Sequence, residues 1–496
     1  MSDETTPVLI GTGQITQKDV DPREARGPIE MMRDAARLAA DDAGIGAAGL
    51  AKIDRLAVVR FMSGNYADPV ALLAEAIGAH PTDRQHTAVG GNSPQMLVNE
   101  TAEKIARGEA KLALLTGVEV LSTITRAQKM GIDIPFGAIT LTEEDRNGSL
   151  PVELAHGLFP PVNVYPMFEN ALRAKRGRSL KAHLKKIGDL FAPFTKVAAA
   201  NPNAWFPIER TAEELVTPSA RNRFVGYPYT KLVNAIIEVD QSAAVLMASV
   251  AEAKRLGVPR ENWVYLHGCA DTKDHWYVME RVNYHSSPAI RTMGREAFAM
   301  AGKTVADMRY FDIYSCFPSA VQIAKQELAL PEVDDIPLTV TGGLPYFGGP
   351  GNNYVMHSIA EMARRLRADP GTYGLVTANG WYVTKHAAGI YSTEPPEQPF
   401  ARKDPKLYQS EIDAEAKPAL ALEPTGTGRV ETYTVVHGRD GEPYMGIVIG
   451  RLEDGSRFVA NTPTDADVFD LLLDGEAIGR KGKVTTSGGQ NTFDPR

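Results

Sequence analysis

Val89-Gly90-Gly91-Asn92-Ser93-Pro94 joins an expected strand to an expected helix whose apolar residues include Met96, Leu97 and Ile105. The two glycines allow the backbone to turn sharply. Asn92 is therefore expected at a helix N-terminus, beside free N–H groups and the positive end of the helix dipole. Enzymes place an activated cysteine at such a position because the dipole favours the thiolate. An asparagine amide cannot act as a nucleophile, so the stretch offers the setting of a reactive group without the group itself.

Length and composition indicate a large globular protein. The chain has 496 residues, of which 43% are hydrophobic and 23% are charged. That length suggests roughly two to four domains, and the composition allows a sizeable core. The net charge of −8 argues against a general nucleic-acid binder, because such a protein needs a basic face.

The N-terminal residues, the lack of a long apolar run and the cysteine pattern indicate a cytoplasmic protein. The acidic start at residues 1–4 does not resemble a signal peptide, and no apolar run is long enough to span a bilayer. The two cysteines, Cys269 and Cys316, form no CxxC pair, and no zinc-like cluster is present. We therefore expect a cytoplasmic protein without disulfides, membrane spans or a metal site.

Strand and helix patterns alternate through the first part of the chain. Strands are expected at residues 7–13, 56–59 and 112–117, with helices at about 29–43 and 71–77 between them. Such alternation predicts an α/β fold with a mostly parallel sheet covered on both faces.

The chain then repeats itself after an interruption. Residues 119–238 are rich in proline, basic and aromatic residues, and we interpret them as an inserted loop domain or lid. Residues 90–117 and 348–380 both read as glycine turn, long helix, apolar strand and glycine. This internal similarity predicts two related halves placed face to face, although any two strand–helix units share some similarity by chance.

The last part of the chain changes character again. Residues 428–436 alternate, residues 438–441 and Asp454-Gly455 form turns, and short apolar runs lie between and after them. This spacing predicts an antiparallel meander or small barrel, and we expect residues 485–496 to be a frayed tail. The expected organisation is an N-terminal half of residues 1–118 and 239–258, a lid of residues 119–238, a C-terminal half of residues 259–395, a linker of residues 396–418, and a barrel of residues 419–496.

Several stretches, in one order along residues 7–395, together resemble the thiolase superfamily, and in particular its sterol-carrier-type thiolases. The stretches are Gly90-Gly91-Asn92-Ser93, Met167 in Tyr165-Pro166-Met167, Asp240-Gln241-Ser242-Ala243-Ala244, Tyr314-Ser315-Cys316-Phe317, Gly342-Gly343-Leu344 and Gly348-Gly349-Pro350. The resemblance implies two duplicated βαβαβαββ halves in a layered αβαβα arrangement, with an inserted loop domain. The C-terminal stretch resembles the OB-fold domains of thiolase-associated proteins.

The sequence departs from that family where its chemistry is carried out. The resemblance implies that Asn92 replaces the nucleophilic cysteine, Gly349 the catalytic histidine and Ala378 the second cysteine, while Tyr314 stands at an oxyanion-hole position. Thiolase chemistry needs a thiolate, a base and oxyanion donors. These substitutions argue against acyl transfer by the family's usual route.

Two other residues could form a rearranged catalytic pair. Cys316 begins a helix after a strand, where the pKa of a thiol can be lowered, and His386 follows a strand expected to end at the cleft. The alternatives are a small buried cysteine and a structural histidine. Tyr314 could donate to an oxyanion or simply fill the end of its strand.

The resemblance implies that coenzyme A or an acyl-CoA is the ligand. In thiolases the lid holds the phosphates, so Arg221, Arg223 and Lys231 are candidate phosphate contacts. Met167 matches a methionine that lies against pantetheine, and Ser242 lies in the matching Asp240–Ala244 segment. The basic run from Arg173 to Lys186 could serve the same purpose or form a solvated helix face.

Three functional hypotheses follow. The first is a thiolase-like protein that binds an acyl-CoA of lipid or sterol metabolism without the family's chemistry. The second is an active acyltransferase of the acetyl-CoA acetyltransferase class that uses Cys316 and His386. The third is a non-catalytic subunit that docks a protein partner through its acidic C-terminal barrel, or associates with itself. The distance between Cys316 and His386 distinguishes the first hypothesis from the second, because the two groups can act as a catalytic pair only if they are close enough to share a proton.

Overall fold

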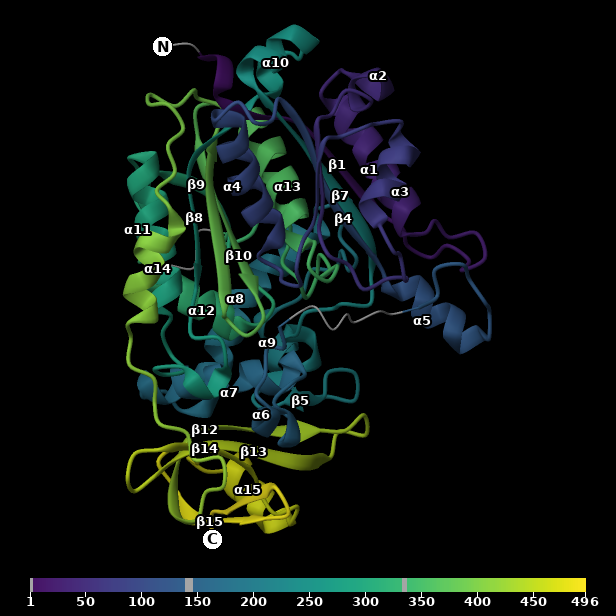
Figure 1. Ribbon diagram of the computed structural model, residues 1–496. Helices are drawn as coiled ribbons and strands as arrows, with labels where there is room; N and C mark the ends of the chain where they lie inside the picture. The colour runs from purple at the N-terminus through teal and green to yellow at the C-terminus, as the bar shows by residue number, and fades with distance from the viewer. Residues whose placement is uncertain (1–2, 139–145, 332–336) are drawn as a thin grey trace.

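The computed structural model describes residues 3–138, 146–331 and 337–496. Its larger sheet has nine strands in the order β3-β2-β4-β7-β1-β8-β11-β10-β9. The strands are β1 (Pro7–Thr16), β2 (Arg55–Val58), β3 (Asp83–His86), β4 (Leu112–Val120), β7 (Asp240–Ser249), β8 (Val264–Lys273), β9 (Met308–Asp312), β10 (Tyr373–Gly380) and β11 (Lys385–Ser392). Figure 1 shows this sheet in the upper part of the molecule.

The two halves of this sheet repeat one strand order, which confirms the predicted duplication. In the first half β2 and β4 are parallel, and β7 runs antiparallel between β4 and β1. In the second half β9 and β10 are parallel, and β11 runs antiparallel between β10 and β8. Within the sheet, two described residue pairs between β1 and β8 connect the halves.

The sheet is mixed, whereas the alternation of strands and helices predicted mostly parallel pairing. The reversal at β7 follows from where the lid is inserted. Val120 at the end of β4 is the register partner of Asp240 at the start of β7. The chain therefore leaves and re-enters the sheet at the same edge, so the returning strand must run the opposite way.

Helices cover the sheet in layers, and two of them lie at the centre. These two, α4 (Ser93–Ala106) and α13 (Tyr354–Ala368), pack against each other and against strands of both halves. The outer helices include α1 (Pro28–Asp42) on the first half and α11 (Pro288–Ala301) on the second. The remaining helices of this region are α2 (Gly46–Leu50), α3 (Pro69–Ile77), α10 (Val250–Leu256), α12 (Pro318–Glu327) and α14 (Pro405–Asp413). The last of these falls within the segment expected to be a linker.

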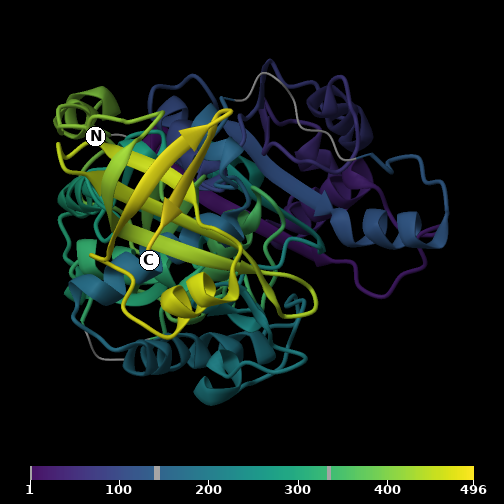
Figure 2. The same cartoon turned by 90° about the horizontal axis from the view of Figure 1, so that it is seen from below.

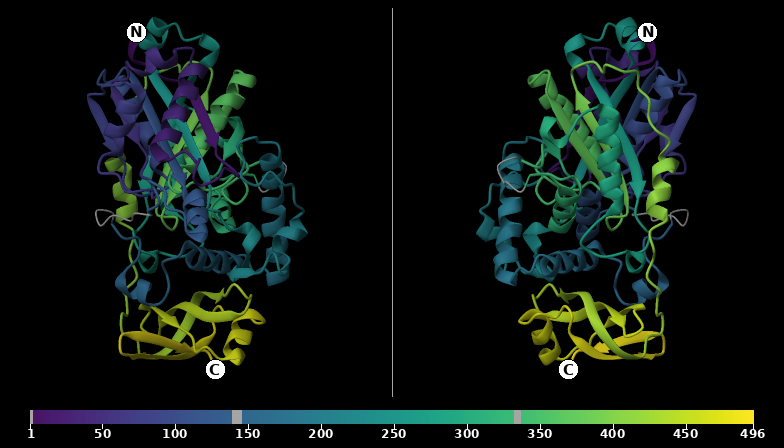
Figure 3. Two further views of the ribbon diagram at one scale, coloured as in Figure 1. Left: turned by 90° about the vertical axis from the view of Figure 1, so that its right-hand side faces the viewer. Right: turned by 90° about the vertical axis from the view of Figure 1, so that its left-hand side faces the viewer.

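The lid lies between the large sheet and the C-terminal barrel (Figure 3). Its elements are α5 (Leu121–Met130), α6 (Pro151–Ala155), α7 (Pro161–Lys175), α8 (Leu180–Ala199), α9 (Ala212–Val216), β5 (Phe224–Gly226) and β6 (Tyr229–Thr230). Within the lid, α7 continues through Pro166. Pro166 lies inside the helix and removes one hydrogen bond from it, while α7 buries the continuous run of residues 163–173.

The C-terminal strands form a closed five-stranded barrel, as predicted in outline (Figure 2). They are β12 (Gly426–His437), β13 (Pro443–Leu452), β14 (Arg457–Asn461), β15 (Lys481–Ser487) and β16 (Gln490–Asp494), with α15 (Ala466–Leu473) beside them. Pairing of β12 with β13 closes the barrel, and β5 of the lid extends it from β12.

The expectation of a frayed C-terminal tail is wrong. Residues 481–494 form the β15–β16 hairpin, and Phe493 is fully buried in the barrel core. Gly488 and Gly489 both have positive φ angles of 57° and 79°, as a tight hairpin turn requires. The Gly-Gly pair was the signal in the sequence.

Two absences hold over the part of the chain that the structure describes. No helix there is both long and apolar enough to cross a membrane. The same residues contain no group of three or more histidine, cysteine or carboxylate side chains placed to hold a metal ion.

Candidate functional site

The glycine turn places Asn92 where the sequence predicted it, at the N-terminus of α4. The side chain is only 5% exposed. Its Nδ2 lies 3.9 Å from Met96 Sδ, and its Oδ1 has no hydrogen-bond partner among the described residues. The central helix thus begins with a buried amide whose acceptor oxygen is unsatisfied.

Both glycines of the turn are needed because the opposite half of the fold approaches them closely. A Cβ atom on Gly91 would lie 2.4 Å from the Tyr314 hydroxyl and 2.5 Å from the Asn379 carbonyl oxygen. The Gly90 N–H donates to Asn352 Oδ1 at 2.9 Å, from the loop that leads into α13. Residues from both repeats therefore meet at this turn.

Lys385 is a site residue that the sequence analysis missed. It is the first residue of β11 and the register partner of Gly380, and its ammonium donates to the Val89 carbonyl in the glycine turn. Opposite residues of an antiparallel pair face the same side of a sheet, and the next residue faces the other. Because side chains alternate along a strand, the sequence around His386 could have placed Lys385 on the side of the sheet that α4 covers. Only the register of β10 and β11 shows that Lys385 reaches the glycine turn.

Cys316 lies in a second cluster with Tyr165 and Asn379. Asn379 Nδ2 lies 2.9 Å from the Tyr165 phenol oxygen and 3.9 Å from Cys316 Sγ. Burial raises the pKa of the Cys316 thiol to about 12. Burial likewise raises the pKa of the Tyr314 phenol, so both groups are neutral at physiological pH.

His386 belongs to a different buried cluster. Its Nε2 lies 3.0 Å from the Val383 carbonyl oxygen and 3.8 Å from the Asp274 carboxylate. Burial lowers the pKa of this imidazole to about 4. No hydrogen bond joins Cys316 to His386 within the described residues, and each side chain has other neighbours.

The hairpin between β10 and β11 is strained. Trp381 and Val383 have φ angles of 56° and 57°. Residues other than glycine rarely adopt positive φ angles, and a β-branched residue such as valine does so least of all. The Tyr165 hydroxyl donates to the Trp381 carbonyl at 2.7 Å, and Arg281 donates to the carbonyl of Val383. Such strain is typical of functional sites, where surrounding contacts hold it in place. Here the contacts from Tyr165 and Arg281 hold the hairpin that leads into β11, the strand that begins at Lys385.

The other residues singled out from the sequence lie in varied surroundings. Gly349 donates its N–H to the Ile236 carbonyl at 2.7 Å, and Ala378 is buried in β10. Met167 is buried in α7 within the hydrophobic core. The Ser242 hydroxyl donates to the Gly117 carbonyl inside the sheet at 2.8 Å. None of these four contributes a side-chain polar group to the turn at Asn92.

The three basic candidates lie on the last segment of the lid. Arg221 and Lys231 are exposed, whereas Arg223 is half-buried. Arg223 donates to the Phe224 carbonyl at 2.7 Å. The two exposed side chains can reach solvent-borne groups, so they stay candidates for phosphate contacts.

Glu119, at the end of β4, gives a testable pH dependence. Its fully buried carboxylate accepts from the Met62 and Ser63 N–H groups at 2.9 and 3.1 Å, and burial raises its pKa to about 7. The folded protein therefore holds this proton more tightly than the unfolded chain does. Its contribution to stability is present below about pH 4.5 and is lost as the pH rises through 7.

We expect Glu119→Gln to make the decrease in the free energy of unfolding between low and high pH smaller by on the order of 3 kcal/mol. The measurement is the free energy of unfolding of both proteins at pH 5 and pH 8. An equal pH slope in the two proteins would show that Glu119 titrates normally.

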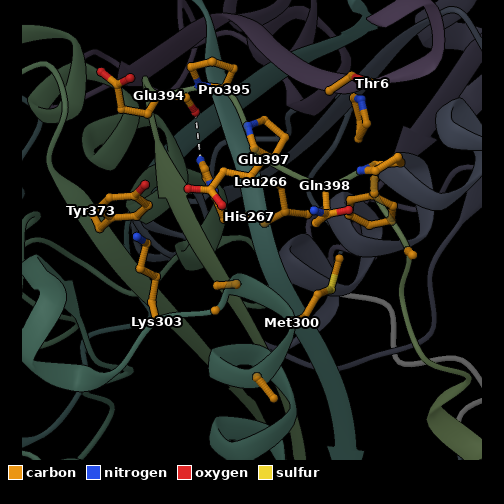
Figure 4. Close-up of a pocket in the computed structure, with 18 residues that line it drawn as sticks. Thr6, Leu266, His267, Met300, Lys303, Tyr373, Glu394, Pro395, Glu397 and Gln398 are labelled. Atoms are coloured by element: carbon orange, nitrogen blue, oxygen red, sulfur yellow. Dashed lines mark hydrogen bonds between the residues drawn. The ribbon is translucent and has the colours of Figure 1, made fainter. Parts of the chain in front are cut away.

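A separate cavity of about 650 Å³ lies at the opposite end of the sheet (Figure 4). It is lined by His267, Lys303, Tyr373 and Glu394 among others. Tyr373 begins β10 and Gly380 ends it, so this cavity is about 23 Å along the strand from the turn at Asn92. It is not part of the same site.

Comparison with known proteins agrees with this fold. The thiolase-like protein type 1 additional C-terminal domain matches residues 408–489. The chain is 39% identical to a monomeric SCP2-thiolase like protein type 1 from Mycobacterium smegmatis, whose crystal structure superposes with a TM-score of 0.87 over 99% of both chains. The chain belongs to the SCP2-thiolase-like protein type 1 family.

Other relatives of this SCP2-thiolase-like protein are more distant. Over 283 residues it is 28% identical to the 17-hydroxy-3-oxo-4-pregnene-20-carboxyl-CoA lyase of Mycobacterium tuberculosis, covering 52% of this chain and 69% of the lyase. The Ltp2-ChsH2(DUF35) aldolase is 18% identical with a TM-score of 0.62, over 79% of this chain and 98% of that one. The acetyl-CoA acetyltransferase of Syntrophomonas wolfei is 15% identical with a TM-score of 0.57, over 78% and 99%. The two structures below 25% identity share the fold.

Proposed function

We propose that this protein is cytoplasmic and binds an acyl-CoA, or a related thioester of lipid or sterol metabolism, at the turn that presents Asn92. The observation that carries the proposal is the convergence of both repeats on that turn. Gly91 is packed against Tyr314, and Lys385 reaches Val89. The Lys385 ammonium supplies donors for a carbonyl oxygen, while Asn92 supplies no nucleophile.

Two features support the proposed binding of coenzyme A phosphates and the proposed cytoplasmic location. The exposed Arg221 and Lys231 on the lid are the groups we assign to the phosphates of coenzyme A. Both cysteines are buried free thiols, which suits a reducing compartment such as the cytoplasm.

Isothermal titration calorimetry with coenzyme A, acetyl-CoA and a long-chain acyl-CoA tests the proposal. Saturable binding of one or more of these ligands is expected, and adenosine 3′,5′-bisphosphate serves as a control for binding through the phosphates alone. Absence of binding by all three ligands would overturn the proposal.

The structure offers little support for the acyltransferase alternative. Cys316 would have to be a thiolate and His386 its base, yet burial raises the pKa of the first to about 12 and lowers that of the second to about 4. The two groups also have separate neighbours.

Cys316 is accordingly expected to resist alkylation. In the native protein at pH 7.5, iodoacetamide should leave this thiol unmodified over an hour, because only the thiolate reacts. In urea both cysteines should be alkylated within that time, as peptide mass spectrometry can show. Rapid modification of native Cys316 would restore the acyltransferase alternative.

A carbon–carbon lyase is a second candidate, favoured by the 28% identity to the M. tuberculosis lyase. Retro-aldol cleavage of a 3-hydroxyacyl thioester needs no acyl-accepting nucleophile. The hydroxyl loses its proton, the bond between C2 and C3 breaks, a carbonyl product leaves, and C2 of the thioester enolate takes up a proton. Release of a carbonyl compound with a shorter acyl-CoA from 3-hydroxyacyl-CoA substrates tests it, and intact substrates after long incubation would exclude it.

Docking of a protein partner through the barrel is the third candidate. Leu422 and Tyr444 in the barrel region are exposed apolar side chains, 56% and 54% accessible. Substituting both by serine should release a partner that co-purifies with the full chain, whereas an unchanged elution profile on size exclusion would count against this role.

A further inference from the structure

The unsatisfied acceptor of Asn92 indicates what this site binds. Buried polar groups in folded proteins almost always have hydrogen-bond partners, and an unpaired one costs free energy. Asn92 Oδ1 is buried and has no partner within the described part of the chain. A ligand that donates a hydrogen bond to this oxygen would remove that cost.

A cationic group stands beside the same oxygen. A Cβ atom on Gly90 would lie 2.4 Å from Asn92 Oδ1 and 2.6 Å from Lys385 Nζ. A Cβ atom on Gly380 would lie 2.6 Å from Asn92 Oδ1 and 3.2 Å from Lys385 Cε. The amide oxygen and the ammonium therefore lie close together, and both pack tightly against these two glycines.

Lys385 is oriented for this role by the glycine turn. Its ammonium has three N–H donors, and the Val89 carbonyl accepts from it. The hairpin that precedes β11 is held by hydrogen bonds from Tyr165 and Arg281 to its carbonyl groups. The ammonium is thus held next to the acceptor rather than directed into bulk solvent.

Few ligand groups can satisfy both neighbours at once. A thioester or ketone carbonyl only accepts hydrogen bonds, so it pairs with Lys385 and leaves Asn92 unsatisfied. A methylene satisfies neither. A hydroxyl donates its proton to Asn92 Oδ1 while its oxygen accepts from Lys385.

We infer that the acyl group bound at this site carries a hydroxyl close to the thioester, as in a 3-hydroxyacyl-CoA, and that the hydroxyl bridges Asn92 and Lys385. This inference rests on the proposed function, since it requires the thioester to bind at the turn. It adds the feature of the acyl chain that the protein selects.

Three ligands of equal chain length test the inference: 3-hydroxybutyryl-CoA, acetoacetyl-CoA and butyryl-CoA. At C3 of the acyl chain, 3-hydroxybutyryl-CoA carries a group that both donates and accepts a hydrogen bond. Acetoacetyl-CoA carries only an acceptor at that carbon, and butyryl-CoA carries neither. In calorimetric titrations the wild-type protein should bind the hydroxy ligand roughly tenfold more tightly than butyryl-CoA, as expected for one well-placed hydrogen bond. Acetoacetyl-CoA should not reach the affinity of the hydroxy ligand.

Two variants locate the selectivity. Asn92→Leu and Lys385→Met should each bring the ratio of hydroxybutyryl to butyryl affinity close to one. Lys303→Met is the matched control, because Lys303 lies at the far end of β10 over the Tyr373 ring, 4.7 Å from its centroid (Figure 4). That variant should keep the wild-type ratio.

The outcomes separate this inference from the proposed function. Equal binding of the three ligands by the wild-type protein would overturn the hydroxyl inference, since a bound water would then satisfy Asn92, and leave thioester binding intact. Binding of none of them would overturn both. The unfolding temperatures of the variants show whether a loss of selectivity for hydroxybutyryl-CoA over butyryl-CoA comes from the missing ligand contact or from a destabilised fold.

Discussion

Replacing Arg457 by methionine is expected to lower the free energy of unfolding by about 3–5 kcal/mol. This arginine is fully buried in β14 where the barrel meets the rest of the chain. Its guanidinium pairs with Glu431 at 2.6 Å and donates to the Met279 carbonyl at 2.8 Å. It also lies 4.8 Å from the centroid of the Tyr284 ring. Methionine fills similar space, but it removes the donor to the Met279 carbonyl and one of the two arginines that pair with Glu431.

Arg451→Met is the matched control. Arg451 pairs with the same carboxylate, Glu431, at 2.8 Å, but its side chain is 32% exposed. Partly exposed ion pairs contribute about 1 kcal/mol or less. Chemical denaturation, with limited proteolysis to detect release of the barrel, compares the two variants. Similar losses would show that burial of Arg457 is not what holds the barrel.

Gly91→Ala is expected to weaken acyl-CoA binding by roughly 5- to 150-fold, because about 1–3 kcal/mol of overpacking falls on the site itself. The added methyl would lie 2.4 Å from the Tyr314 hydroxyl and 2.5 Å from the Asn379 carbonyl. Either the turn or the facing half must move, and the groups around Asn92 would move with it. Titration calorimetry with the tightest acyl-CoA ligand measures the effect.

Gly475→Ala controls for a general effect of alanine. Gly475 is exposed, and its nearest contact to an added Cβ is the Leu471 carbonyl at 3.3 Å. This variant should bind like the wild type. If Gly91→Ala also bound normally, the turn would not be the ligand site.

Local sequence patterns predicted much of the fold. The glycine turn at Asn92, the central helix after it and the similarity of two segments that each run glycine turn, helix and strand could be read from residues near one another in the chain. The barrel followed from closely spaced strands with turn residues. These features depend on period and turn chemistry, which a short stretch of sequence fully specifies.

Features that depend on contacts between distant segments could not be predicted in the same way. The reversed β7 depends on where the lid returns to the sheet, beside Val120. The burial of Phe493 in the barrel depends on strands far from it in sequence. The neighbours of His386 depend on a cluster with Asp274, which periodicity does not reveal.

The sequence by itself determined that a strand, a tight turn and a helix place Asn92 at a helix N-terminus, because glycine conformation and helix periodicity are local properties. Only the tertiary structure brought Lys385, Tyr314 and Asn379 to that turn, since they come from the other repeat, more than 200 residues away. It also left the Asn92 oxygen buried without a partner among the described residues. Pairing of a buried polar atom depends on every segment packed around it, and the sequence does not state which segments those are.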